Sequence, residues 1–191
     1  MTVLDAFDRA AAMVTALVTA VRDDQWTRPT ACADWDVRGV VNHLAHGNAK
    51  VAFWAGAGPA APDGDYLGPD PSPAFAASVV SARSVLAEPG LFSRTVTTPL
   101  GDVPGEFLVH MRVNEYLAHG WDIADATGQP TDLLPDLAES ALAQWRTRFG
   151  DRPRPPGGPF GAEVPAPPEA AATAADRLAA VLGRKAVGAP E

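Results

Sequence analysis

The sequence is short of the residues that several classes of protein need. It has a single cysteine, Cys32, so no intramolecular disulfide can form and a cysteine-based zinc site is excluded. Apolar runs are too short to span a bilayer, and acidic residues within the first eight positions disfavour a signal peptide. We therefore expect a cytoplasmic protein with no membrane partner.

Aromatic residues and positive charge are also scarce. Aromatic residues make up only 7% of the 191 residues, and 15 basic residues face 23 acidic ones, for a net charge of −8. An acidic surface repels the phosphate backbone, so we expect no nucleic-acid binding. Alanine dominates the hydrophobic fraction of 47%. Because alanine is the strongest helix former, the composition predicts an all-α fold.

Apolar residues recur at helical spacing in five long segments. Helices are predicted over residues 2–22, 36–54, 72–88, 105–127 and 134–149. Asp36 is predicted to cap the second helix, and Ser72 to cap a third helix that starts at Pro73. Trp35 and Trp121 are expected to pack in the core at helix ends.

The remaining segments are irregular or short. Residues 56–71 are rich in glycine, proline and aspartate and are predicted as an exposed connection, and residues 94–104 as a short hairpin. We predict a four-helix bundle with this peripheral hairpin over residues 1–150. Residues 151–191 are predicted as a proline-rich tail whose short helix, at about 169–182, packs on the bundle.

The helix predicted at 105–127 carries two residues of chemical interest. Glu115 and His119 are four positions apart, so at about 100° per residue they lie within roughly 40° of each other. We expect a different face of this helix to meet solvent, and that face carries His110, Asn114, Trp121 and Asp125. A carboxylate and an imidazole that face inward need a partner, and a metal ion is one way to supply it.

A third ligand is expected from the helix predicted at 36–54. His43 lies on the flank of its apolar face, from which it can reach a neighbouring helix, whereas His46 points away from that face, towards water. Two histidines and one carboxylate leave coordination positions open, as in catalytic rather than structural sites. Zinc, nickel, iron(II) or manganese could occupy the set His43, Glu115 and His119.

Each of these residues also has an ordinary structural interpretation. Glu115 and His119 could be an exposed helix pair, which contributes only a few tenths of a kcal/mol, and Glu115 could pair with Arg112. Asp122 could orient His119 by a hydrogen bond or form a plain helix salt bridge. Cys32 could be a reactive thiol or a small buried hydrophobic residue.

Three stretches of the sequence resemble one known family. Residues 32–44, CADWDVRGVVNHL, are similar to the start of the second helix in the DinB-like superfamily. They are most similar to the metal-binding domain of mycothiol-dependent maleylpyruvate isomerases and their short actinobacterial relatives. Residues 112–128, RVNEYLAHGWDIADATG, resemble the second hallmark of that family, and residues 160–184 resemble the tails of the short relatives.

The resemblance implies a DinB-like four-helix bundle with metal ligands at His43, Glu115 and His119, the set that the helical wheels also favour. In family members with known activity the metal binds a low-molecular-weight thiol, so zinc and mycothiol are the implied cofactors. The isomerases carry an additional C-terminal domain that contributes to the active site. After Phe149 this sequence offers only the proline-rich segment and a short helix, so metal and thiol binding are more expected than maleylpyruvate isomerisation.

The sequence leaves three functions open. The first is a metal-dependent thiol transferase or isomerase, whose partners would be a small-molecule thiol and a substrate that the sequence does not name. A homodimer is an option for its assembly. The alternatives are a metal-binding module without turnover and a metal-dependent hydrolase, which needs only a metal-bound water. Thiol binding by the metal-loaded protein would separate the first class from the others.

Overall fold

The structure, a computed structural model, describes residues 2–32, 34–150, 154, 160–166 and 172–187. In chain order its elements are α1 (Val3–Thr19), η1 (Asp23–Gln25), α2 (Val37–Trp54), α3 (Pro71–Leu86), η2 (Leu91–Ser93), β1 (Thr95–Thr98), β2 (Gly101–Pro104), α4 (Glu106–Thr127), α5 (Pro135–Phe149) and α6 (Ala174–Val181). Most of the predicted proline-rich segment lies outside the described residues.

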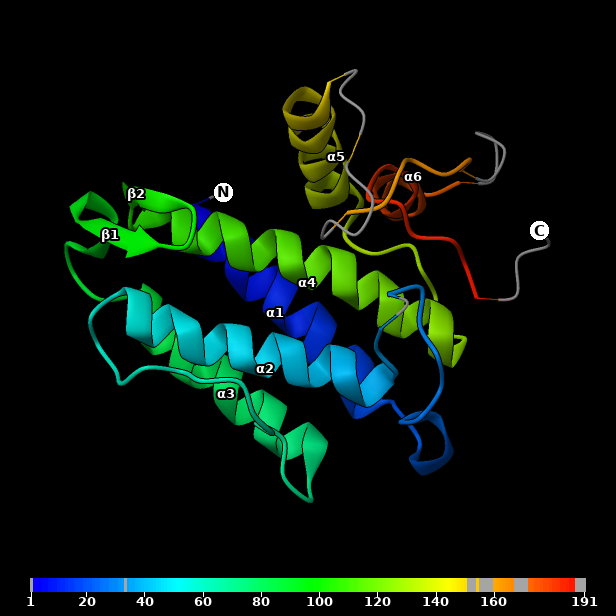
Figure 1. Cartoon of the computed structure of the whole chain (residues 1–191), viewed down its shortest axis with the longest axis horizontal. Helices are drawn as coiled ribbons and strands as arrows, with labels where there is room; N and C mark the ends of the chain where they lie inside the picture. Colours follow the sequence, from blue (N-terminus) through cyan, green and yellow to red (C-terminus); the bar gives the residue numbers. More distant parts are fainter. Residues whose placement is uncertain (1, 33, 151–153, 155–159, 167–171, 188–191) are drawn as a thin grey trace.

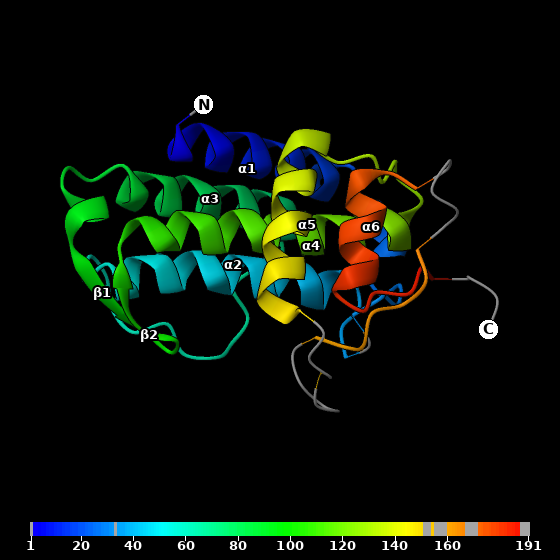
Figure 2. The same ribbon diagram turned by 90° about the horizontal axis from the view of Figure 1, so that it is seen from above.

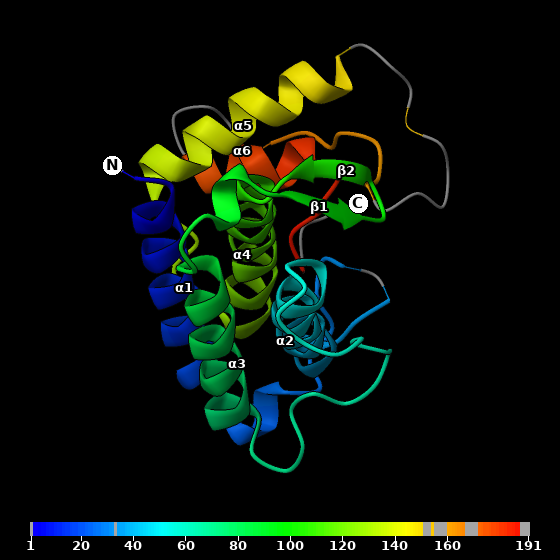
Figure 3. The ribbon, with the colours of Figure 1, turned by 90° about the vertical axis from the view of Figure 1, so that its left-hand side faces the viewer.

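Helices α1 to α4 form the predicted four-helix bundle. α1 packs against α3 and α4, and α2 packs against the same two helices, so all four surround one core (Figure 3). The strands β1 and β2 pair antiparallel as a hairpin at one end of the bundle (Figure 1). The all-α bundle with a peripheral hairpin is therefore confirmed.

Local sequence signals start and stop these helices. The Asp36 carboxylate accepts a hydrogen bond from the Gly39 N–H at 2.8 Å, which is the predicted cap of α2. Gly128 ends α4 with a φ of +72°, a conformation that glycine adopts without strain. The predicted start of the third helix is wrong by two residues. Pro71 takes the first position of α3, and the Ser72 hydroxyl instead donates to the Val18 carbonyl at 3.2 Å.

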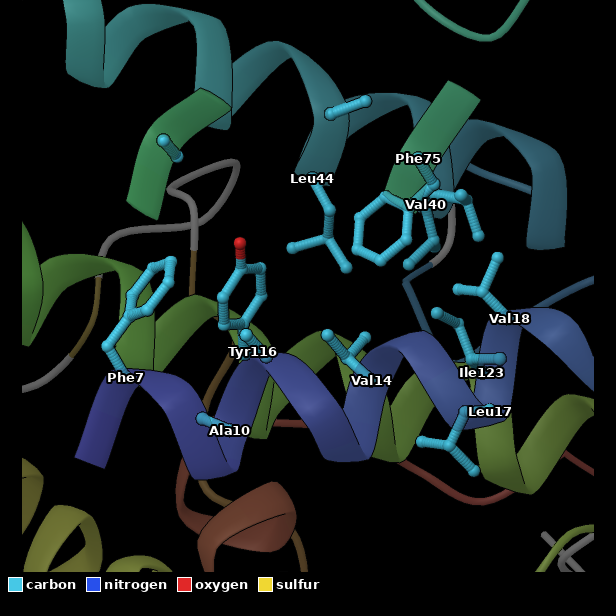
Figure 4. Packing of buried hydrophobic residues seen from close by; sticks show 14 of the residues in the cluster. Phe7, Ala10, Val14, Leu17, Val18, Val40, Leu44, Phe75, Tyr116 and Ile123 are labelled. Carbon is cyan, nitrogen blue, oxygen red and sulfur yellow. The ribbon is translucent and has the colours of Figure 1, made fainter. Parts of the chain in front are cut away.

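The core contains apolar side chains from all four helices (Figure 4). Phe7 of α1 and Tyr116 of α4 have ring centroids 5.6 Å apart, and Leu44 of α2 and Phe75 of α3 are fully buried. The Tyr116 hydroxyl donates to Asn48 Oδ1 at 2.6 Å, so these buried polar groups satisfy each other. Dense packing of this kind fixes α2 and α4 relative to each other and positions the side chains that they carry.

Helices α5 and α6 pack on each other outside the bundle, with α6 against α4 (Figure 2). These two helices cover the face of α4 that was predicted to meet solvent. Of the four residues predicted on that face, only His110 is exposed. Trp121 packs in the core, as expected for this residue, and donates to Asp176 at 2.8 Å. Asn114 accepts a hydrogen bond from Trp145 at 3.0 Å. A helical wheel shows which residues share a face, but it does not show that a second layer covers that face.

The segment after α6 also contacts the bundle, because the Val187 N–H donates to the Asp125 carboxylate of α4 at 2.7 Å. The division of the chain into residues 1–150 and 151–191 stays a prediction. Of the helices within the described residues, none combines the length and the apolar character needed to cross a membrane.

Candidate metal centre

The packing of α2 against α4 brings His43, Glu115 and His119 together. His43 Nε2 lies 2.8 Å from Glu115 Oε2, and His119 Nε2 lies 3.6 Å from the same oxygen. The two imidazole rings meet edge to face, with centroids 4.9 Å apart. One ligand atom from each of the three residues lies within 4.8 Å of the others. The proximity that the helical wheels predicted is therefore present, across 72 residues of sequence.

The electrostatics of this cluster favour a charged carboxylate and a neutral imidazole. Burial raises the pKa of Glu115, but the hydrogen bond with His43 and the charges of His119 and Arg112 outweigh it and lower the pKa to about 2. Burial lowers the pKa of His43, although the bond to Glu115 opposes this effect. An ionised carboxylate and a neutral imidazole are the forms that bind metal ions.

The tautomer of His119 is set by a second carboxylate. His119 Nδ1 lies 2.8 Å from Asp122 Oδ2, and Asp122 is fully buried. Because a carboxylate accepts hydrogen bonds, this contact favours the tautomer of His119 with the proton on Nδ1, which leaves the lone pair of Nε2 directed towards Glu115 and His43. The guanidinium of Arg184, also buried, approaches the other oxygen of Asp122, with Nε to Oδ1 at 3.5 Å. Arg184 lies beyond α6, so the C-terminal segment reaches the candidate site.

Arg112 supplies a buried positive charge next to Glu115. It is only 2% exposed; it donates to the Leu44 carbonyl at 3.1 Å and lies over the ring of Tyr116, with Cζ 4.8 Å from the centroid. The guanidinium passes so close to Gly47 that a Cβ there would overlap it. Arg112 therefore acts on Glu115 through its buried charge, and among the described residues the i, i+3 ion pair that the sequence also allowed is not formed.

Two residues of the loop before α2 border the cluster. Trp35 is half-buried and stacks on His43 with ring centroids 4.5 Å apart, so it covers a candidate ligand rather than only filling the core. Cys32 and the pair His119 and Asp122 form a second group whose ligand atoms lie within 4.8 Å of one another. A single cysteine rules out a site made of several cysteines, but Cys32 can still be one ligand of this mixed group.

The first group is nevertheless the better metal site. Burial and the negative charge of Asp122 raise the pKa of the Cys32 thiol, and a thiol must lose its proton to bind a metal. In the second group the Nδ1 atom of His119 already contacts Asp122 through a hydrogen bond, so this nitrogen is less available to a metal ion.

His46 lies apart from the cluster, but not for the reason predicted from the helical wheel. Its side chain is buried under the connection between α2 and α3 rather than pointing to water. Nε2 lies 2.8 Å from the carbonyl oxygen of Ala61, and the ring stacks on Tyr66 at 4.8 Å. The predicted exposed connection is thus partly packed, because Leu67 is buried and Tyr66 contacts Asn42 and His46 of α2.

The donor set suits a divalent ion. Metal–ligand bonds of about 2.1 Å in a tetrahedral site place ligand atoms roughly 3.4 Å apart. The two N···O separations of 2.8 and 3.6 Å lie on either side of that value, so small side-chain shifts would accommodate the ion. The fold and this cluster define a helical bundle with two histidines and one carboxylate held between two of its helices.

Comparison with known proteins gives the family. The profile of the family described as "Mycothiol maleylpyruvate isomerase N-terminal domain" matches residues 7–124, and the chain belongs to this family. Two uncharacterised proteins of Mycobacterium tuberculosis, MT0763 and Rv0738, are each 41% identical over 184 residues, which cover 95% of this chain and 97% of the relative.

A solved structure supports the fold. The crystal structure of the mycothiol-dependent maleylpyruvate isomerase superposes with a TM-score of 0.59 at 16% identity, over 79% of this chain and 72% of that chain. At this identity the likeness concerns the fold alone, and it agrees with the predicted DinB-like bundle.

Proposed function

We propose that this protein binds one divalent metal ion through His43, Glu115 and His119 and uses it to activate a small-molecule thiol of the mycothiol type, as a transferase or isomerase. The proposal depends on the cluster itself. The Nε2 atoms of His43 and His119 both lie close to one half-buried carboxylate oxygen, that of Glu115. Membership of the family supports a thiol as the partner.

A bound metal would supply the positive charge that lowers the pKa of a thiol. The remaining roles belong to the chain. Asp122 holds the proton on Nδ1 of His119 and so presents Nε2. Trp35 restrains the ring of His43 by stacking on it. Three protein ligands leave further coordination positions for an external molecule.

Cobalt(II) gives a direct test of thiol binding, because a sulfur ligand adds a charge-transfer band to its absorption spectrum. We expect this band when mycothiol, or a simpler thiol such as cysteinyl-glucosamine, is added to the cobalt-loaded protein. The same thiol in which sulfur is methylated should give no band, since it cannot lose a proton. If cobalt binds but no thiol alters its spectrum, the transferase proposal is wrong and a metal-binding module without thiol chemistry becomes the better account.

A further inference from the structure

A cavity of about 770 Å³ opens beside the candidate metal centre. It lies between the first half of α4, the second half of α5 and the turn of the β1–β2 hairpin. Figure 2 shows α5 crossing over α4 and the hairpin near the beginning of α4. Its lining residues include Leu100, Phe107, Met111, Glu115, Trp145 and Phe160. Small-molecule sites commonly have volumes of about 300–1,000 Å³, so the cavity is large enough for a substrate.

The cavity and the candidate metal centre share one residue, Glu115 of α4. Phe107, Met111 and Glu115 all line it, and their spacing of four residues places them in one row on the helix. His119 is the next residue in this row. Glu115 therefore belongs to both places, since it lines the cavity and contacts His43. A molecule in the cavity would lie next to a thiol held at the metal centre.

Most of the cavity wall is apolar and aromatic. Trp145 packs against Phe149 and Phe160, with ring centroids 5.0 and 4.7 Å away, and the Nε1 of Trp145 donates to Asn114. These contacts hold the wall in place before any ligand arrives. Leu100, at the hairpin turn, is 60% exposed. A large exposed leucine that lines a cavity is suited to contact an apolar ligand.

Arg148 places one positive charge in this wall. Its guanidinium lies 5.5 Å from the ring centroid of Trp145, and no ion pair of Arg148 is found in the described part of the chain. Arg148 is exposed, so an anion can reach it. Arg154 lies over Phe149 of the same aromatic group, with Cζ 3.9 Å from the ring centroid, so positive charge gathers at this wall although the chain has a net charge of −8.

We propose that this cavity is the substrate site and that it takes an organic acid with an apolar or aromatic body. The body would pack between Leu100, Phe107 and the Trp145 wall, and the carboxylate would bind Arg148. The proposal deepens the proposed function by naming the class of substrate. It rests on that function only for the statement that the bound molecule meets a thiol.

Calorimetric titration of the full chain tests the binding step without metal, in the presence of a chelator. The probes are 4-phenylbutyrate and its uncharged analogue 4-phenylbutyramide, which differ mainly in the charge that Arg148 would meet. We expect the acid to bind three- to fivefold more tightly than the amide, as for a solvent-exposed ion pair. Arg148→Gln should abolish this preference and leave the affinity for the amide nearly unchanged.

Two further variants locate the bound probe. Leu100→Ser should weaken both probes by roughly fivefold, about 1 kcal/mol, through lost apolar contact. Val80→Ser is the matched control, because Val80 is 70% exposed on α3 and lines a separate groove between α1 and α3. The inference is overturned if neither probe binds, if the acid and the amide bind alike, or if Val80→Ser weakens binding while Leu100→Ser does not.

The outcome of these titrations is independent of the metal. If the probes do not bind as expected, the cavity is not the substrate site, but the proposed metal centre is not affected by that result. If no thiol alters the cobalt spectrum, the proposed thiol chemistry is rejected, but the binding of the probes in the cavity is not affected by that result.

Discussion

Replacement of Glu115 by glutamine should destabilise the metal-free protein at neutral pH. The pKa of this carboxyl falls from an ordinary value of 4.5 to about 2 in the fold. A difference of that size corresponds to about 3 kcal/mol of stabilisation by the ionised form. Because 32% of the side chain is exposed, solvent screening reduces the expected value to about 1–2 kcal/mol.

The pH dependence of this effect has a definite sign. Since the pKa is lower in the folded than in the unfolded chain, the carboxylate stabilises the fold fully above about pH 4.5 and progressively less as the pH falls towards 2. The difference in unfolding free energy between wild type and Glu115→Gln should therefore be largest at pH 5–7 and shrink at lower pH.

Urea denaturation in a chelating buffer at pH 7, 5, 4 and 3 measures this difference. The control is Glu163→Gln, which changes an exposed carboxylate and should alter stability by less than about 0.5 kcal/mol. A difference for Glu115→Gln that stays constant across this pH range would refute the assignment of a stabilising charge to Glu115.

Three other substitutions test parts of the site. His46→Ala should leave metal affinity unchanged in a competition titration, because His46 is held by Ala61 and Tyr66 away from the cluster; a loss equal to that of His43→Ala would reject the choice of ligand. Asp122→Asn should lower metal affinity by roughly 10- to 100-fold, as for other groups that orient a ligand, and wild-type affinity would contradict that role. Gly47→Ala should lower stability by about 1–3 kcal/mol in thermal unfolding, because the new methyl group overlaps the buried Arg112, and an unchanged melting temperature would show that Arg112 moves freely.

The parts of the site that sequence predicts are those set by local chemistry. Asp36 fixes where α2 begins, and the beginning of α2 fixes the direction of His43. The spacing of Glu115 and His119 fixes their common face on α4. These short-range rules, with the apolar pattern, are enough to predict the bundle and the meeting of the three residues, whereas their role as metal ligands stays a prediction.

The parts that sequence does not predict depend on distant contacts. Arg184 reaches Asp122 from beyond α6, and neither residue carries a local signal of the other. The loop that covers His46 and the stacking of Trp35 on His43 are likewise tertiary effects. The spacing of Arg112 three residues before Glu115 suggested an ion pair, but only the packed bundle shows that the charge of Arg112 is buried.

The most direct test of the central claim is the affinity for cobalt(II) of the wild type and of the single variants His43→Ala, Glu115→Ala and His119→Ala. We predict one tightly bound ion per wild-type chain. Each variant should lose more than about 100-fold in affinity, because removing a ligand costs more than removing a group that only orients one. His110→Ala, which removes an exposed histidine from the same helix, should bind cobalt as the wild type does. Wild-type affinity in any of the three ligand variants, or no binding by the wild type, would contradict the assignment of this cluster as a metal centre.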